Sequence, residues 1–189
     1  SSLHGLFLND QELNLWLHQE TLERDSIQFH WHNRAYQSFD EFSNELVSKR
    51  RRQVARERRQ FECHGLTTRT LTCNELTPEV ADWMYQFYQA TIEKKFSQFY
   101  LNRQFFETIF ATMKDRVVLF LSQNHGKPVG GSLCFYKGQK LYGRYWGALE
   151  EWRHMHFELC YYRPIEFAIS HKLKLFEAGA QGFHKVQRG

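Results

Sequence analysis

The sequence has few residues that break regular structure, and it has no long apolar run. It contains 3 prolines and 11 glycines among 189 residues, with 42% hydrophobic and 16% aromatic residues. This composition excludes disordered and collagen-like proteins and indicates one domain able to bury a core. The longest purely apolar run is Val117 to Leu121, far shorter than the roughly 20 residues that span a membrane as a helix.

Closely spaced cysteines and a secretory signal are also missing. The first residues lack the basic segment and long apolar core of a signal peptide. No CxxC pair is present, which excludes a zinc ribbon or a thioredoxin-like site. We therefore expect a cytoplasmic protein with reduced thiols. The absence of an initial Met and the abrupt end at Arg188-Gly189 indicate a piece of a longer protein. The cysteines are Cys63, Cys73, Cys134 and Cys160.

Positive charge is concentrated in one segment of the chain. Residues 48–60, SKRRRQVARERRQ, hold seven of the 25 basic residues and one of the 21 acidic residues, which leaves 18 basic and 20 acidic residues elsewhere. A nucleic-acid backbone would be attracted to such a segment. The alternative is a solvated helix face whose charges pair with neighbouring acids. The candidate polyanion ligands are Arg51, Arg52, Arg56 and Arg59.

The first third of the chain predicts two strands and two helices. We expect a strand over residues 1–8, a helix over 10–20, a strand over 26–32 and a long helix over 38–61. Ser38 and Glu41 have the spacing of a capping box at the start of the long helix. Arg50 and Glu57 fall on the apolar stripe of that helix, so each needs a partner if it is buried.

The rest of the chain predicts an α/β (α+β) fold. Pro164 would remove a backbone donor from the last helix and clash with the carbonyl of Cys160, so we expect a kink or break there. The order of strand, two helices, three meander strands, helix and strand fits a mixed sheet with helices on its faces. The expected elements are a strand over 66–73, helices starting at Thr77-Pro78 and over 102–113, three antiparallel strands between 117 and 149, a helix over about 156–171, and a strand over 173–176.

An arginine between two aromatic residues marks the third meander strand. The two-residue repeat of a strand would place Tyr142, Arg144 and Trp146 on one face. The arginine then either packs against the rings or holds an anion.

The segment RHMHFELC, residues 153–160, contains residue types that bind metals. His156 and Cys160 would share a helix face, but no second ligand pair lies elsewhere, so the sequence predicts no metal site. Glu158 and Tyr162 would line one face of this helix, and a carboxylate near a phenol could serve as base and acid. The alternative is acidic residues on an exposed helix surface.

The final segment EAGAQGFHKVQRG, residues 177–189, is polar and contains two glycines. It matches neither the P-loop nor GxGxxG. Gly179 and Gly182 allow a tight turn or a close approach of the backbone to a ligand. A simple polar turn is the alternative. Side chains able to contact an anion or a polar ligand are Gln181, His184, Lys185 and Arg188.

Two of these segments together resemble a known family. HFELCYYRPIEFAI (156–169) and FEAGAQGFHKVQRG (176–189) resemble the FemAB-like family of predicted bacterial N-acyltransferases, and YGRYWG (142–147) and Arg56-Glu57-Arg58 are similar too. The family belongs to the GNAT superfamily and is related to Fem-type enzymes that add amino acids to peptidoglycan precursors. The resemblance, which runs from about Ser26 to the end, implies a GNAT-like mixed, largely antiparallel sheet flanked by helices, with central strands that splay to admit a donor.

The resemblance also implies a division of the chain. The sequence departs from the family pattern at three places. Residues 1–34 would be the trailing strand–helix–strand of a preceding, missing half-domain, and 35–189 a GNAT-like domain truncated at its C-terminus. An acid usually stands where Phe183 is, and Pro164 replaces a helix-compatible residue. The Gln/Arg-x-x-Gly-x-Gly/Ala turn that holds the pyrophosphate of coenzyme A is absent, which makes coenzyme A a less secure donor.

The implied function is an N-acyltransferase without a tightly bound cofactor. It would move an acyl or aminoacyl group from acyl-CoA or aminoacyl-tRNA to an amine, such as that of a peptidoglycan precursor. Glu158 or Glu177 would be the base and Tyr162 an acid. The alternative is a non-catalytic GNAT-fold module that binds tRNA or another polyanion through residues 48–60. Substrate or donor binding is assigned to Arg144, Trp146, His156, Gly179, Gln181, Gly182, His184, Lys185 and Arg188.

Overall fold

The computed structural model describes residues 5, 8–17, 21–22, 27–94 and 98–179. The strands within these residues form one sheet in the order β1-β6-β5-β4-β3-β2. Only β5 and β6 are parallel, and all other neighbouring pairs are antiparallel. The expected mixed, largely antiparallel sheet is therefore confirmed. The strands are β1 (His30–His32), β2 (Thr67–Thr72), β3 (Val117–Asn124), β4 (Lys127–Lys137), β5 (Lys140–Ala148) and β6 (Leu175–Glu177).

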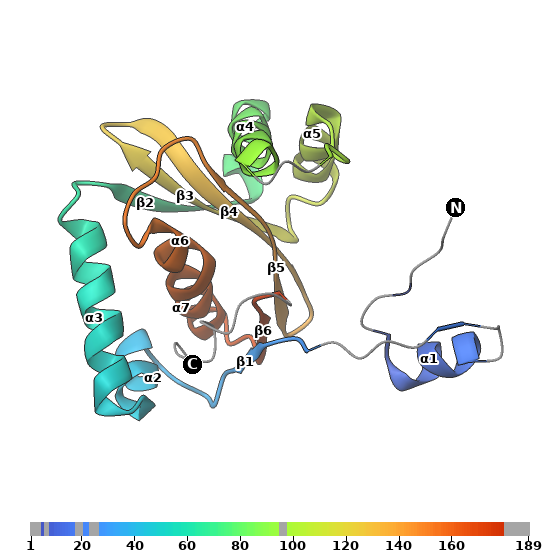
Figure 1. The fold of residues 1–189 in the computed structure, drawn as a ribbon, viewed down its shortest axis with the longest axis horizontal. Helices are drawn as coiled ribbons and strands as arrows, with labels where there is room; N and C mark the ends of the chain where they lie inside the picture. Colours follow the sequence, from blue (N-terminus) through green and yellow to red (C-terminus); the bar gives the residue numbers. More distant parts are fainter. Residues whose placement is uncertain (1–4, 6–7, 18–20, 23–26, 95–97, 180–189) are drawn as a thin grey trace.

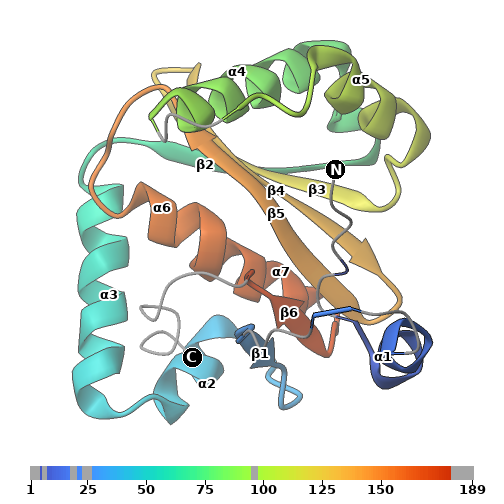
Figure 2. The ribbon, with the colours of Figure 1, turned by 45° about the vertical axis from the view of Figure 1, so that its right-hand side comes forward.

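Helices cover both faces of the sheet. They are α1 (Asp10–Leu17), α2 (Phe39–Glu45), α3 (Ser48–Glu62), the 3-10 turn η1 (Cys73–Glu75), α4 (Pro78–Lys94), α5 (Arg103–Thr112), α6 (Met155–Phe157), the π-helical turn η2 (Glu158–Tyr162) and α7 (Arg163–Ser170). Figures 1 and 2 show α4 and α5 on one face, and α2, α3, α6 and α7 on the other. In Figure 1, α1 lies outside both helix layers.

The central strands are buried on both faces, which explains their uninterrupted apolar sequence. Every residue of Val117–Leu121 in β3 is buried. Val118 and Phe120 enter the core beneath α7, whereas Leu119 and Leu121 enter the core beneath α4 and α5. Each strand residue thus supplies one of two cores, depending on the face to which it points.

Two helix starts expected from the sequence are confirmed. Ser38 caps α2, because its Oγ accepts a hydrogen bond from the N–H of Glu41 at 3.1 Å. The Glu41 carboxylate accepts the N–H of Gln37 at 2.7 Å, so the reciprocal bond of the capping box is shifted by one residue. Pro78 follows Thr77 and begins α4, where its missing N–H costs no helical hydrogen bond.

The prediction of a single helix over residues 38–61 is wrong, because two helices occupy this segment. Leu46 and Val47 have extended conformations, with ψ angles of 141° and 143°, and α3 starts at Ser48. Between Leu46 and Val54 the predicted stripe has no apolar residue facing the core, since Val47 is 71% exposed. No apolar contact therefore holds a straight helix against the sheet at this point.

The structure describes only part of the N-terminal segment, in which a strand, a helix and a second strand were expected. The strand expected over residues 1–8 lies mostly outside the described residues, whereas α1 confirms the beginning of the helix expected over 10–20. The strand expected over 26–32 is shorter, with three residues in β1, and Trp31 is its buried side chain. Because β1 pairs with β6, this part of residues 1–34 belongs to the same sheet as the rest of the fold.

The last helical segment contains the irregularity expected at Pro164. In η2 the N–H of Arg163 donates to the carbonyl of Glu158, five residues earlier, which is a π-helical bond. In a regular α-helix Pro164 would leave the carbonyl of Cys160 without a donor and clash with it. The expected kink or break thus takes the form of one widened turn between α6 and α7.

Candidate functional site

Strands β5 and β6 separate after three residue pairs. Their pairing begins at Lys140 and Leu175 and ends at Tyr142 and Glu177. Within the described part of the chain, no strand pairs with Gly143–Ala148 on the side where β6 lies. The sheet therefore opens at this point, as the splayed strands of the resemblance would require, and the main-chain groups on that side of β5 are not used by the sheet.

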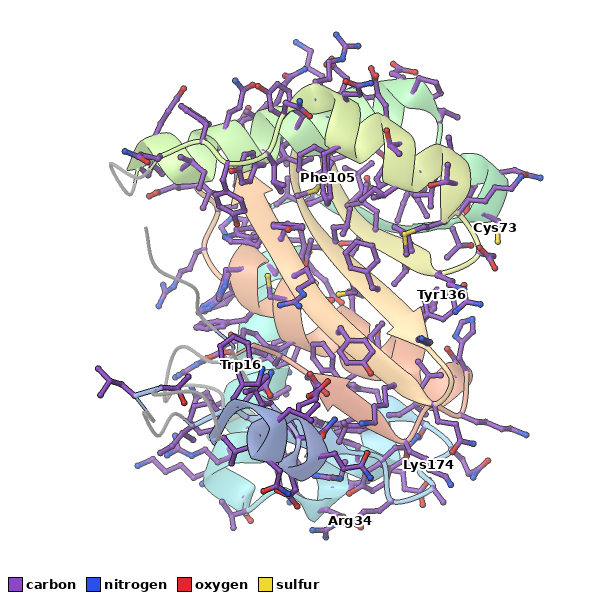
Figure 3. All side chains as sticks on the ribbon, turned by 90° about the vertical axis from the view of Figure 1, so that its right-hand side faces the viewer. Trp16, Arg34, Cys73, Phe105, Tyr136 and Lys174 are labelled. Atoms are coloured by element: carbon purple, nitrogen blue, oxygen red, sulfur yellow. The ribbon has the colours of Figure 1, made fainter. Side chains whose placement is uncertain are left out.

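A β-bulge at Arg144 changes which face the following residues of β5 occupy. The register against β4 shifts there by one residue, so every later side chain points to the opposite face from the one expected. Tyr145 packs beneath α5, where its ring lies 6.0 Å from that of Phe105. Phe105 is labelled on α5 in Figure 3. Trp146 packs in the opposite core, so the prediction that it shares a face with Tyr142 and Arg144 is wrong. Arg144 itself is exposed.

A cavity of about 600 Å³ lies beside the free part of β5. Trp146 of β5, Trp152 of the following loop and His156 of α6 contribute aromatic walls to it. The rings of Trp146 and His156 lie 5.3 Å apart, centroid to centroid. The structure thus brings together two of the residues that the sequence assigned to substrate or donor binding.

The rim of this cavity carries charges of both signs. Lys94 Nζ pairs with Glu151 at 2.9 Å, and the Nε1–H of Trp152 donates to Glu150 at 3.0 Å. Arg153 also lines the cavity and is exposed. Apolar walls with a few polar groups at the rim are typical of a small-molecule binding site.

Helix α4, on the face of the sheet opposite α6, fixes the free part of β5 and lines the cavity with Thr91 and Lys94. The hydroxyl of Thr91 donates to the carbonyl of Trp146 at 2.9 Å. Next to it, the backbone of α4 at Phe87 approaches Gly147 so closely that a β-carbon there would lie 1.8 Å from the Phe87 carbonyl oxygen. This close approach positions one wall of the cavity.

Glu158, a predicted base, lies in a buried ion-pair network rather than in the cavity wall. It is 2% exposed, and both of its carboxylate oxygens accept hydrogen bonds from Arg58, at 3.1 and 3.2 Å. Arg163 Nε lies 2.8 Å from the same carboxylate, and Arg58 and Arg163 both pair with Glu166. Burial raises the pKa of the Glu158 carboxyl above its ordinary value, although the two guanidinium groups act to lower it. This geometry joins α3 to η2 and α7, and the catalytic role of Glu158 stays a prediction.

Tyr162, the predicted acid, is also engaged inside the protein. It is 1% exposed, and its hydroxyl donates to Glu57 of α3, not to Glu158. Glu57 is buried and also accepts a hydrogen bond from Gln53 at 2.8 Å. The expectation that Glu57 would need a partner is confirmed. Arg50, which is half-buried, donates to Gln53 at 3.1 Å.

Replacing Tyr162 with Phe is expected to lower the free energy of unfolding by about 1–3 kcal/mol, because the buried carboxylate of Glu57 loses a donor. Urea unfolding of Tyr162→Phe, alone and combined with Glu57→Gln, measures this effect. If the hydrogen bond is responsible, the cost of removing the hydroxyl is smaller in the Glu57→Gln background. An equal cost in both backgrounds would contradict this explanation.

The remaining predicted site residues lie at the end of β6 and beyond. Glu177 is partly exposed, and Gln28 donates to its carboxylate at 3.4 Å. Gly179 has a φ of 86°, a conformation that glycine adopts readily, as expected for a tight turn. Its role in binding stays a prediction. The predictions for Gln181, Gly182, Phe183, His184, Lys185 and Arg188 lie outside the described residues.

The structure also divides the basic segment into inward and outward residues. Arg52, Arg56 and Arg59 are exposed, whereas Arg51 is half-buried and donates to the Asn44 carbonyl at 3.4 Å. Within the described ranges, no group of three or more His, Cys, Asp or Glu could hold a metal ion, and no helix is long and apolar enough to cross a membrane. All four cysteines are free.

Two residues that shape this region were not singled out from the sequence, and a third, Arg58, was named only within the segment Arg56-Glu57-Arg58 of the resemblance. Thr91 and Trp152 belong to no motif, and only the folded chain brings them to β5. Arg58 was counted with the basic segment, although it lies four residues after Val54 and three before Phe61, both of the apolar stripe. That position was a usable signal, because a helix residue beside the apolar stripe is often only partly exposed.

Comparisons with known proteins agree with the fold. The model of the FemAB-like family, described as peptidoglycan biosynthesis/recognition, matches residues 1–189. The structure of FemX has a TM-score of 0.61 at 15% identity, covering 85% of this chain and 55% of FemX. L-PGS from Bacillus licheniformis has a TM-score of 0.53 at 10% identity, covering 71% of this chain and 43% of L-PGS. The chain thus spans about half the length of these structures, and no curated protein matches its sequence significantly.

Proposed function

Because the chain belongs to the FemAB-like family of peptidoglycan biosynthesis/recognition, we propose that it transfers an acyl or aminoacyl group from an activated donor to an amine. The observation that carries this proposal is the cavity beside the free part of β5, at the point where β5 and β6 separate. A donor lying there would contact main-chain N–H groups of β5 that the sheet does not use on one side and the aromatic walls on the other.

The reaction requires two things from the protein: donors for an oxyanion and a base. The amine must attack the carbonyl carbon of an ester or thioester, so that a C–N bond forms and the bond to the leaving oxygen or sulfur breaks. Backbone N–H groups of Gly143–Ala148 that point away from β4 would donate to the oxyanion of the tetrahedral intermediate. A base must accept the proton of the attacking amine.

His156 is the cavity residue best suited to accept this proton. It lines the cavity and lies against Trp146. Histidine is the side chain that most often serves as a general base, because a neutral imidazole nitrogen can accept a proton. Glu158 and Tyr162 would then act at a distance, by holding the helix on which His156 lies.

The charges at the cavity rim and the description of the family support a choice of acyl donor and of acceptor amine. Acyl-CoA and aminoacyl-tRNA are the donors that we propose, since both carry an activated acyl group on a polyanionic carrier. Arg153 and Lys94 at the cavity rim would attract the anionic carrier. The acceptor would be the amine of a peptidoglycan precursor, in keeping with the description of the family.

Replacing His156 with Ala is expected to lower kcat/KM by about 100-fold or more, the usual contribution of a positioned base. The assay incubates the full chain with acetyl-CoA, longer acyl-CoAs or aminoacyl-tRNA and a soluble peptidoglycan precursor, and it detects the amide product by mass spectrometry. His32→Ala is the matched control, because His32 is exposed on β1. Unchanged kcat/KM in His156→Ala, or no amide product with any donor, would contradict the proposal.

A further inference from the structure

Four basic residues of α3 lie on one side of the helix. Lys49, Arg52, Arg56 and Arg59 are spaced three, four and three residues apart, and all are exposed. At 100° and 1.5 Å per residue, they fall within an arc of about 80° and extend over about 15 Å. We call this set the α3 stripe.

The other side of α3 packs against the rest of the protein. Val54, Glu57 and Phe61 are buried there, and Arg58 is paired with Glu158 and Glu166. Figures 1 and 2 show α3 at the edge of the molecule, so that one side of the helix faces away from the sheet. The helix therefore has a core side and a cationic side.

The charges of the α3 stripe are not neutralised by acidic side chains of the described residues. No ion pair within residues 5, 8–17, 21–22, 27–94 and 98–179 includes a member of the stripe. This argues against a solvated face whose charges pair with neighbouring acids. Like charges three and four residues apart repel one another on a helix, so a bound polyanion would relieve a repulsion that the folded chain leaves in place.

We propose that the α3 stripe binds the sugar–phosphate backbone of a nucleic acid. A straight row of cations about one helical turn apart matches a linear array of phosphates, and the side chains offer hydrogen-bond donors to phosphate oxygens. An anionic membrane surface is the competing partner. It is disfavoured because a helix that lies on a membrane needs a large apolar face toward the lipid, whereas the exposed surface of α3 offers one small apolar residue, Ala55.

The α3 stripe leads to the rim of the cavity. Gln60, next to Arg59, is hydrogen-bonded to His154 at 2.8 Å, and the ring of His64 lies 5.4 Å from that of Trp152. The exposed, cavity-lining Arg153 precedes His154. A nucleic-acid strand bound by the α3 stripe would thus run toward the cavity. Binding by the stripe does not depend on the proposed transfer reaction, and it can be measured without it.

The first test compares two triple variants of the full chain. Arg52→Gln/Arg56→Gln/Arg59→Gln removes three charges from the stripe, and Lys127→Gln/Lys137→Gln/Lys140→Gln removes three exposed charges from the strand ends, so both lower the net charge from +4 to +1. Fluorescence anisotropy measures binding of a short duplex RNA, a duplex DNA of the same length, and vesicles of phosphatidylcholine and phosphatidylglycerol. Circular dichroism and Tm establish that each variant is folded.

The stripe variant is expected to bind both duplexes about tenfold or more weakly, with the salt slope reduced by about 2 to 3, since each phosphate contact contributes about 0.9 to it. The strand-end variant is expected to bind as the wild type does. Equal loss in both variants would mean that net charge alone attracts the duplex, and would overturn the proposal. Binding to the vesicles but to neither duplex would overturn it in favour of the membrane.

A second measurement needs no change in the stripe. Cys63 is exposed and lies four residues after Arg59, on the same side of α3, whereas the exposed Cys73 lies in η1. A photo-crosslinker on Cys63 in the Cys73→Ser variant is expected to capture the labelled duplex, and the same group on Cys73 in the Cys63→Ser variant is not. Capture from Cys73 alone, or from neither position, would overturn the proposal even if the triple variant failed to fold.

Discussion

Replacing Gly147 with Ala is expected to lower the free energy of unfolding by about 3 kcal/mol, at the upper end of what overpacking costs. The added β-carbon would lie 1.8 Å from the carbonyl oxygen of Phe87 and 2.3 Å from its carbonyl carbon. These are backbone atoms of α4, so no side-chain rotation relieves the overlap. The helix must move away from β5, and the hydrogen bond from Thr91 to the carbonyl of Trp146 is then lost.

Thermal unfolding measures this effect. A loss of 3 kcal/mol corresponds to a fall in Tm of about 6–12 °C for a chain of this length. Gly143→Ala is the matched control on the same strand, because the nearest atom to its added β-carbon lies at 3.4 Å, an ordinary contact distance. If both variants unfold at the same temperature, the close approach of α4 to β5 does not limit stability. Gly147→Ala should also weaken binding in the cavity, since α4 and β5 both line it.

Local interactions explain which parts of the fold were predictable. Ser38 and Thr77, where helices were expected to start, each accept a hydrogen bond from the backbone N–H three residues later, so their signals lie within one turn of sequence. The meander of β3, β4 and β5 was predictable because short turns join its strands. The π-helical turn before Pro164 was predictable as an irregularity, because the missing N–H of a proline disturbs the turn that precedes it.

Long-range packing decides the parts that were not predictable. The bulge at Arg144 exchanges the cores that Tyr145 and Trp146 enter. Gly143 precedes the bulge, and a glycine inside a strand often marks one, but Gly147 gives β5 the same signal at a position where the register does not shift. The candidate site shows the same limit. Trp146 and His156 were assigned together and do meet, because β5 and α6 are joined by one short loop. Tyr162 instead turns to a carboxylate 105 residues earlier in the chain.

Replacing Arg58 with Ala is expected to lower the free energy of unfolding by about 3–5 kcal/mol, the usual cost of removing one member of a buried ion pair. Arg58 makes two hydrogen bonds to Glu158 and contacts Glu166 at 2.7 Å. Its guanidinium also lies 4.6 Å from the centre of the Phe39 ring, a cation–π contact that joins α2 to this network. Arg58→Lys should recover only part of the loss, because an ammonium group cannot form the bidentate contact.

The pH dependence of Arg58→Ala separates lost charge pairing from lost packing. Burial already raises the pKa of Glu158 in the intact network, with Arg58 acting to lower it, so removing Arg58 should raise that pKa further. The folded variant then binds a proton more readily than the unfolded chain, and its stability should increase as the pH falls from 7 toward 5. The difference from the wild type should therefore shrink over this range, and it should be smaller at every pH in the Glu158→Gln background. A difference that is constant with pH and equal in both backgrounds would assign the role of Arg58 to packing against Phe39. The ion pair between Arg58 and Glu158 would then contribute nothing to holding α3 against the helix that carries His156.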